Sequence, residues 1–238
     1  MSPTIPLFIM LHTETVEAET MALIRQLMSD QQLEDFFLVG GTALSLLMGH
    51  RKSIDIDLFN RSSFDSARLS RHLQEHYHVE NLKVLKNGVF CDIDGVKVDM
   101  LTHEYKRMDF WLEDEGVRME SIKDLGAMKL NAIVGSGTRL KDFVDMYFLL
   151  ECESLEHFLD AVEKKYPEIN RKMATTALRY YQDIKPTPIV FTGSPISQQD
   201  FSQRFDEAVL QPHKVFDITP LPGRDTWRDR DQGFGFSR

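Results

Sequence analysis

Cysteine is scarce in this chain of 238 residues, which contains only Cys91 and Cys152. Two cysteines are too few for a disulfide framework or a cysteine zinc site, and they fit a reducing compartment. Long hydrophobic runs are also missing. Residues 5–11 are apolar but fall well short of the about 20 residues that a membrane span needs, and they lack the flanks of a signal peptide. We therefore expect a cytoplasmic protein with no membrane partner.

Basic charge is in the minority, with 28 lysines and arginines against 37 acidic residues and a net charge of -9. Nonspecific nucleic-acid binders usually carry a basic surface, so this balance disfavours a histone-like role. Residues 1–170 hold 18 basic and 29 acidic side chains, a balance of -11, whereas residues 171–238 hold 10 and 8, a balance of +2. An RNA would meet least repulsion at the C-terminal part.

Hydrophobic periodicity predicts an α+β fold, in which a small mixed β-sheet core precedes a C-terminal helical domain. The expected helices and strands are a helix over 14–29, a strand over 36–39, a helix over 42–48, a strand over 54–59, a helix capped by Ser63 and running to Tyr77, strands over 79–85, 88–93 and 96–101, an acidic loop at 113–115, and helices over 121–134, 138–150, 154–166, 171–182 and 199–210.

Three segments follow from this pattern. We expect a catalytic core over residues 1–115 and a helical domain over 116–185 that completes the active-site cleft. Six of the nine prolines lie from Pro186 onward, which predicts a partly irregular extension over 186–238. Its last part, residues 222–238, is rich in glycine, aspartate and arginine and is expected to be mobile.

The strand over 54–59 carries two carboxylates on one face. Asp55 and Asp57 alternate with apolar residues, so their side chains should lie a few ångströms apart. The apolar face is predicted to comprise Ile54, Ile56 and Leu58. Carboxylates that close repel each other unless a cation lies between them, and Mg²⁺ or Mn²⁺ binds carboxylate and phosphate oxygens together. A bare Asp-x-Asp is more often an ordinary edge strand, so the surrounding residues must decide.

Three neighbouring features favour the metal site. Gly40, Gly41 and Thr42 precede a helix, where glycine lets a phosphate approach free backbone N–H groups. Asp99 alternates with Val98 and Met100, so a third carboxylate could join the pair across the sheet. Lys129 lies within the apolar stripe of its helix, either facing a triphosphate or extending to the edge of the stripe.

Two further groups of residues each allow two interpretations. In the basic segment before the paired carboxylates, Arg51 could hold a phosphate with two hydrogen bonds or simply solvate a loop, and Ser53 follows it. On a later helix, Lys141, Asp142 and Asp145 share one face. They form either an exposed Lys141–Asp145 salt bridge or part of the site.

Residues 36–150 resemble a known family. Phe37–Leu44, Gly49–Phe59 and Val96–Asp99 resemble the nucleotidyltransferase signature of the DNA polymerase beta-like superfamily, with a glycine pair, a short helix, an Asp-x-Asp strand and a third aspartate. More narrowly, Asp124–Ile133 followed by Arg139–Tyr147 resembles the AbiEii/AbiGii toxin family. The sequence departs at Gly41, where the superfamily commonly has serine and where Thr42 could supply the hydroxyl. It also departs at residues 135–137, before Arg139.

The resemblance implies a Mg²⁺-dependent (or Mn²⁺-dependent) enzyme that transfers a nucleotide from an NTP to an acceptor hydroxyl. Asp55, Asp57 and Asp99 would hold the metal, and Asp99 would activate the hydroxyl. Lys129 and Asp145 complete the expected catalytic set. The residues expected to contact the nucleotide are Gly40, Gly41, Thr42, Arg51, Ser53, Lys129 and Asp142. Family members are toxins of toxin–antitoxin or abortive-infection systems, and some modify tRNA, so tRNA or another RNA and a cognate antitoxin are the expected partners.

Alternatives share part of this evidence. A nucleotidyltransferase acting on an antibiotic or metabolite would keep every catalytic residue, and the charge of -9 favours it. A noncatalytic nucleotide-binding protein would need a broken acid set, which Asp55, Asp57 and Asp99 argue against. His72 and His76 match a zinc-protease pattern but lie on a surface helix. A metal-dependent glycosyltransferase would need a larger nucleotide-binding region before its Asp-x-Asp.

Overall fold

Alternating apolar side chains build a seven-stranded mixed sheet, with the strands in the order β3-β4-β5-β2-β1-β7-β6. The strands are β1 (Phe36–Val39), β2 (Ile56–Asn60), β3 (Val79–Leu85), β4 (Gly88–Ile93), β5 (Val96–Thr102), β6 (Leu112–Asp114) and β7 (Val117–Met119). The computed structural model describes residues 10–221, so the expectation for residues 222–238 and most of the apolar run over 5–11 lie outside the described residues. No helix within 10–221 has both the length and the apolar character that crossing a membrane requires.

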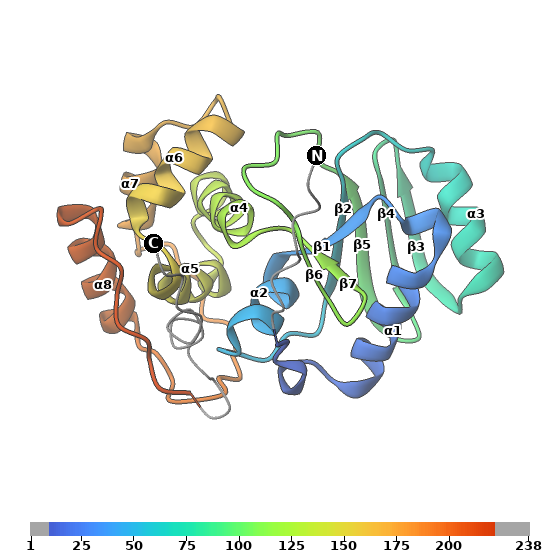
Figure 1. Cartoon of the computed structure of the whole chain (residues 1–238), viewed down its shortest axis with the longest axis horizontal. Coiled ribbons are helices and arrows are strands. Elements are labelled where there is room, and N and C mark those ends of the chain that lie inside the picture. Colours follow the sequence, from blue (N-terminus) through green and yellow to red (C-terminus); the bar gives the residue numbers. More distant parts are fainter. Residues whose placement is uncertain (1–9, 222–238) are drawn as a thin grey trace, which may run out of the picture.

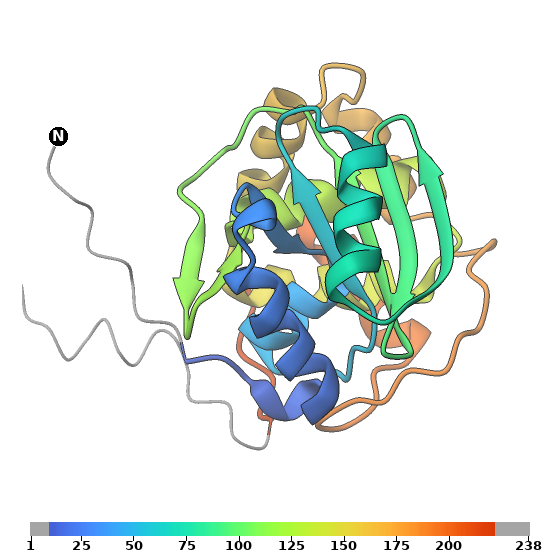
Figure 2. The same ribbon diagram turned by 90° about the vertical axis from the view of Figure 1, so that its right-hand side faces the viewer.

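The helices form two groups around the sheet. α1 (Ala18–Ser29) and α3 (Ser66–His76) cover one face, while α2 (Gly40–Met48) and the later helices lie on the other side, as Figures 1 and 2 show. The later helices are α4 (Ile122–Gly135), α5 (Leu140–Cys152), α6 (Leu155–Lys165), α7 (Arg171–Leu178) and α8 (Gln198–Leu210). Short 3-10 turns lie at Thr13–Thr15 and Gln31–Leu33. The expected α+β class is confirmed.

Buried apolar side chains join the sheet to the helices in one continuous core. Alternate residues of β2, β4 and β5 are buried, and these pack toward α1 and α3. α4 contacts α2, α5, α6 and α7, so it is the central helix of the second group. The face of the sheet that carries the candidate carboxylates therefore looks toward this helical group.

Four local expectations need correction. Ile54 does not face the core, because β2 begins at Ile56 and Ile54 is 60% exposed. α3 is capped by Asp65, whose side chain accepts from Arg68 N, and not by Ser63. α2 begins at Gly40, before Thr42. The expected acidic loop at 113–115 lies in the β6–β7 hairpin, whose turn has positive φ at Glu115 and Gly116.

The chain after α7 crosses back over the segment that precedes β2. Phe191 pairs with Arg51 in an isolated antiparallel bridge, and Lys52 N donates to Val190 O at 2.8 Å. Residues 190–192 thus fix the backbone beside the candidate basic segment. The proline-rich region also forms α8, which packs against α5.

α4 and α6 pack so closely that a side chain at Gly126 has no room. A Cβ built there would clash with the ring of Phe158. We expect Gly126→Ala to lower the free energy of unfolding by about 1–3 kcal/mol, because overpacking a tight contact forces side chains or backbone to shift. Gly135→Ala is the matched control in the same helix, since a Cβ there meets nothing within 4 Å. The control should be neutral or stabilising in urea unfolding. Equal stability for both variants would contradict the close contact.

Candidate active site

Two carboxylates lie side by side at the centre of the sheet. β2 and β5 run parallel, and their register pairs Asp57 with Asp99. Because paired residues share a face of the sheet, both side chains point toward the helical group. Asp55 lies just before β2, and its charge acts on both Asp57 and Arg51. The structure therefore brings the three predicted carboxylates to one region.

Asp57 is electrostatically strained. Burial, together with the nearby charges of Asp99 and Asp55, raises the pKa of Asp57, and Lys129 and Lys97 offset only part of this. Lys97 donates a hydrogen bond to Asp99 Oδ2. The other oxygen, Asp99 Oδ1, is buried and has no hydrogen-bond partner among residues 10–221. The pair thus holds more negative charge than its neighbours compensate.

Gly40 is required where β1 turns into α2. Its φ is +70°, and a Cβ at this position would clash with Asp57 Oδ2. Only glycine combines that conformation with so close an approach to a carboxylate. The neighbouring Gly41 makes room for the guanidinium of Arg51. Both glycines therefore accommodate side chains of this protein, a reason for the pair that the sequence alone did not show.

Thr42 and Ser53 support the backbone at Asp55. The Thr42 hydroxyl donates to Asp55 O and lies 2.8 Å from Ser53 Oγ. Both residues are buried. Both hydroxyls therefore form hydrogen bonds within the protein. The sequence had suggested instead that the Thr42 hydroxyl contacts a phosphate.

Asp145 is the centre of a buried ion cluster that contains several of the predicted residues. Its carboxylate accepts from Arg51 Nε at 2.6 Å and Arg51 Nη2 at 2.9 Å. It also lies 2.8 Å from His50 Nε2 and 2.7 Å from Lys129 Nζ. Burial alone would raise the pKa of Asp145, but Arg51 and Lys129 outweigh it and hold that pKa well below the ordinary value. The simpler expectation, an exposed Lys141–Asp145 pair, is wrong.

Lys129 connects the ion cluster to the carboxylates. Its Nζ lies 2.8 Å from Asp142 Oδ1, and the side chain is buried. Burial lowers the pKa of Lys129, but Asp145 and Asp142 outweigh it, so the ammonium stays charged. That charge favours ionised Asp57 but does not outweigh the burial and the neighbouring carboxylates that raise the pKa of Asp57. Burial lowers the pKa of Arg51, but Asp145, Asp142 and Asp55 raise it by more.

The chemistry of this site suits a divalent cation. Asp57 and Asp99 are hard oxygen donors, one oxygen of Asp99 is unsatisfied, and the pair lacks full compensation. Within residues 10–221, no three histidine, cysteine, aspartate or glutamate side chains already form a metal-binding cluster. Mg²⁺ commonly takes one or two carboxylates and completes its shell with water and substrate phosphates. The residues therefore fit part of such a shell.

Asp124 is a structural residue that we did not single out from the sequence. It is buried and lies 2.7 Å from Lys165 Nζ, and it accepts from Met108 N at 3.0 Å and Asp109 N at 3.1 Å. This carboxylate ties α4 and α6 to the chain between β5 and β6. Its position three residues after Ser121, which caps α4, was the available signal.

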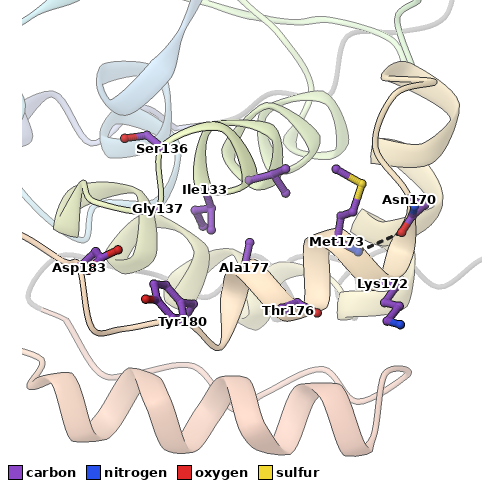
Figure 3. A pocket seen from close by; sticks show the side chains of 11 residues that line it. Ile133, Ser136, Gly137, Asn170, Lys172, Met173, Thr176, Ala177, Tyr180 and Asp183 are labelled. Atoms are coloured by element: carbon purple, nitrogen blue, oxygen red, sulfur yellow. Dashed lines mark hydrogen bonds between the residues drawn. The ribbon is translucent and has the colours of Figure 1, made fainter.

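A pocket of about 510 Å³ lies between the end of α4 and α7, apart from the carboxylates. Ile133, Ala177 and Met173 line its length in Figure 3, with Tyr180 and Asp183 at one end. None of the predicted site residues is among those lining it. The pocket is therefore a separate feature of the helical group.

A carboxylate pair beside a glycine-opened helix defines a class of enzyme, the nucleotidyltransferases, and comparison with known families agrees. More narrowly, the chain belongs to the family described as nucleotidyl transferase AbiEii toxin, type IV TA system, whose model matches residues 22–229. The resemblance found in the sequence is thereby confirmed.

Individual relatives are more distant. The chain is 32% identical over 157 residues to an uncharacterized protein of Aquifex aeolicus, covering 63% of this chain and 76% of that protein. Among solved structures it resembles JHP933 of Helicobacter pylori, with 16% identity, a TM-score of 0.42, and coverage of 81% of this chain and 93% of the other. It also resembles the Thermotoga maritima CCA-adding enzyme complexed with tRNA, with 16% identity, a TM-score of 0.36, and coverage of 69% and 51%.

Asp145→Asn tests the buried ion cluster. Removing one charge leaves Arg51 and Lys129 underpaired in the core, so we expect a loss of about 3–5 kcal/mol in the free energy of unfolding at pH 7. Because the folded-state pKa of Asp145 is depressed, the difference from wild type should shrink as the pH falls below about 4. Asp160→Asn, in a surface ion pair, is the control and should change stability by less than about 1 kcal/mol. Comparable losses for both would refute the central role of Asp145.

Asp57→Asn should have the opposite effect on stability in metal-free buffer. The raised pKa means that ionised Asp57 destabilises the fold, so the amide should raise the free energy of unfolding at pH 7. That gain should disappear as the pH is lowered through the folded-state pKa toward the ordinary value of about 4. Urea unfolding in EDTA across this range measures it. A less stable variant at pH 7 would contradict the strain at Asp57.

Proposed function

We propose that this protein is a Mg²⁺-dependent toxin that transfers a nucleotide from an NTP to a hydroxyl of RNA, with tRNA as the expected acceptor. The observation that supports this most is the uncompensated Asp57–Asp99 pair on neighbouring parallel strands. Asp55, Asp57 and Asp99 would hold the metal. When bound, the ion would neutralise phosphate charge and polarise the phosphorus that is attacked.

Asp99 is the proposed proton acceptor. Its Oδ1 atom is buried without a partner among the described residues, while Lys97 occupies Oδ2. The acceptor hydroxyl would lose its proton to the Asp99 carboxylate as its oxygen bonds to the α-phosphorus, and pyrophosphate would leave with the electrons of the broken P–O bond. Positioning of the reactants and electrostatic stabilisation account for most of the catalysis in such a transfer.

The beginning of α2 is the proposed phosphate site. The first N–H groups of a helix lack intrahelical acceptors, and they attract anions. Gly40 and Gly41 add no side chains to this turn, and the carboxylate of Asp57 and the guanidinium of Arg51 lie against it. Arg51 and Lys129 are balanced by Asp145 and Asp142, so we assign the cluster a positioning role: it fixes Gly41 and holds the Lys129 charge near Asp57. Thr42 and Ser53 position Asp55.

The biological assignment rests on the family. A toxin of a type IV toxin–antitoxin system implies a cognate antitoxin, and we propose one as a partner. The balance of +2 over residues 171–238 supports an RNA acceptor approaching from the C-terminal part. The overall charge of -9 supports the second candidate, a small-molecule acceptor with the same catalytic residues.

Incubation with each α-labelled NTP, Mg²⁺ and total RNA tests the proposal. We expect label on RNA with wild type and loss of at least about 100-fold with Asp99→Asn, because both the metal ligand and the proton acceptor are altered. Asp94→Asn, at the exposed turn of the same hairpin, is the matched control and should keep full activity. Label found only on small molecules would show that the acceptor is a small molecule, the second candidate, and not RNA. No transfer from any NTP would refute the enzyme assignment for this chain.

A further inference from the structure

A row of aromatic side chains crosses the sheet beside the carboxylates. We call Trp111, Phe37, Phe59, His103, Tyr105 and Tyr166 the aromatic row. The ring centroids lie 5.6 Å apart for Trp111 and Phe37, 5.1 Å for Phe59 and His103, 4.8 Å for His103 and Tyr105, and 4.6 Å for Tyr105 and Tyr166. Phe37 and Phe59 are register partners on β1 and β2, so the two parts of the row lie on the same face of the sheet.

The aromatic row lies on the same face as the proposed catalytic residues. Phe59 follows Asp57 by two positions on β2, so its side chain projects from the same face about 6–7 Å farther along the strand. The start of α2 contacts Asp57, which precedes Phe59. The row therefore lies on the other side of the carboxylates from the proposed phosphate site.

Part of this aromatic surface is unusually open. Tyr105 is 37% exposed and Trp111 is 38% exposed, and Phe110 beside it is 72% exposed. Large aromatic side chains gathered on the surface commonly mark a binding site. A cation adds to this surface, because the guanidinium of Arg107 lies 4.3 Å from the centroid of the Phe37 ring.

The segment over residues 105–111, which carries the exposed rings, is held in place by hydrogen bonds to buried side chains. Asp124 accepts from Met108 N and Asp109 N, and Lys165 Nζ donates to Lys106 O at 3.1 Å. Glu120 pairs with Arg107 through two hydrogen bonds of 2.8 Å. Figure 1 shows this segment, between β5 and β6, passing between the sheet and the helical group. The surface is thus fixed before any ligand arrives.

His103 adds a neutral ring to the row. Burial, and next the charge of Lys165, lower the pKa of His103 to about 4. Its Nε2 lies 3.0 Å from the Tyr166 hydroxyl. Near pH 7 the imidazole is uncharged and offers a flat face.

We propose that the aromatic row is a stacking site for an unpaired nucleobase, with Tyr105 and Trp111 as its exposed rings and the fully buried Tyr166 packed against Tyr105. The inference rests on the proposed function, since it takes the ligand of the carboxylate site to be a nucleotide. Unpaired bases stack on aromatic rings and on arginine planes, which is the chemistry found here. A base in this place belongs either to the end of the acceptor RNA or to the incoming NTP, and the site serves to place the reacting hydroxyl or phosphate at Asp57 and Asp99.

Tryptophan fluorescence tests the site without catalysis. The chain has two tryptophans, so Trp227→Phe leaves Trp111 as the single reporter in the full-length protein. Two probes carry bases, an eight-nucleotide oligoadenylate and ATP. Their controls are an abasic oligonucleotide of the same length and ribose 5-triphosphate, which keep the phosphates and remove the base. We expect quenching by at least one base-bearing probe and none by its baseless control.

Tyr105→Leu in the same background should weaken the affinity for the quenching probe by about ten-fold, since stacking on one ring contributes this order of affinity. Tyr180→Leu is the matched control, because Tyr180 is an exposed aromatic residue that lines the separate pocket. It should leave the affinity unchanged. Equal effects of the two variants would count against the aromatic row.

The possible outcomes show whether the bound base belongs to the acceptor RNA or to the NTP. Quenching by oligoadenylate supports a site for the acceptor base, and quenching by ATP supports a site for the base of the NTP. Equal response to a probe and its baseless control, or no response to either base-bearing probe, would overturn the proposal. A protein that transfers label but shows no base-dependent quenching keeps the proposed function and loses this site. Base-dependent quenching without transfer of label would support this base-binding site and refute the proposed enzymatic function.

Discussion

The parallel pairing of β2 with β5 places Asp57 and Asp99 next to each other on a half-buried face of the sheet. Other features of the site accommodate this pair of like charges. Gly40 leaves space for one carboxylate, and Lys97 neutralises part of the other. Burial and Asp99 raise the pKa of Asp57, and Lys129 and Lys97 offset only part of this. In our account, the metal and the substrate complete a site that the fold keeps electrostatically strained.

The Asp145 cluster provides the rigidity that such a strained pair requires. It joins α5 to α4 through Lys129 and to the segment before β2 through Arg51. Buried ion pairs contribute little net stability when both desolvation and attraction are counted, but removing one partner is costly. We therefore interpret the cluster as a device that fixes the relative positions of the sheet and the helical group. The return of residues 190–192 over Arg51 reinforces this connection.

Local patterns predicted the parts of this site that depend on neighbouring residues. Alternation predicted the strand that carries Asp57. The strands predicted over 79–85, 88–93 and 96–101 match the β3–β5 meander, whose turns lie at Asn87–Gly88 and Asp94–Gly95. Contacts between distant residues were not predictable, because no local pattern specifies that Arg51 meets Asp145. The β6–β7 hairpin was missed because its strands have three residues each and carry acidic side chains. No local pattern indicated that the ring of Trp111 lies beside that of Phe37.

Carboxyl-carbon NMR titration of Asp57 in the wild-type protein tests the central claim most directly. Assignment by comparison with the Asp57→Asn spectrum identifies its signal, and the titration is run with and without Mg²⁺. The account predicts a pKa above the ordinary aspartate value in EDTA, because burial and Asp99 oppose ionisation, and a lower pKa when Mg²⁺ is present. An ordinary or depressed pKa that does not respond to Mg²⁺ would contradict the claim that Asp57 and Asp99 form an undercompensated cation site.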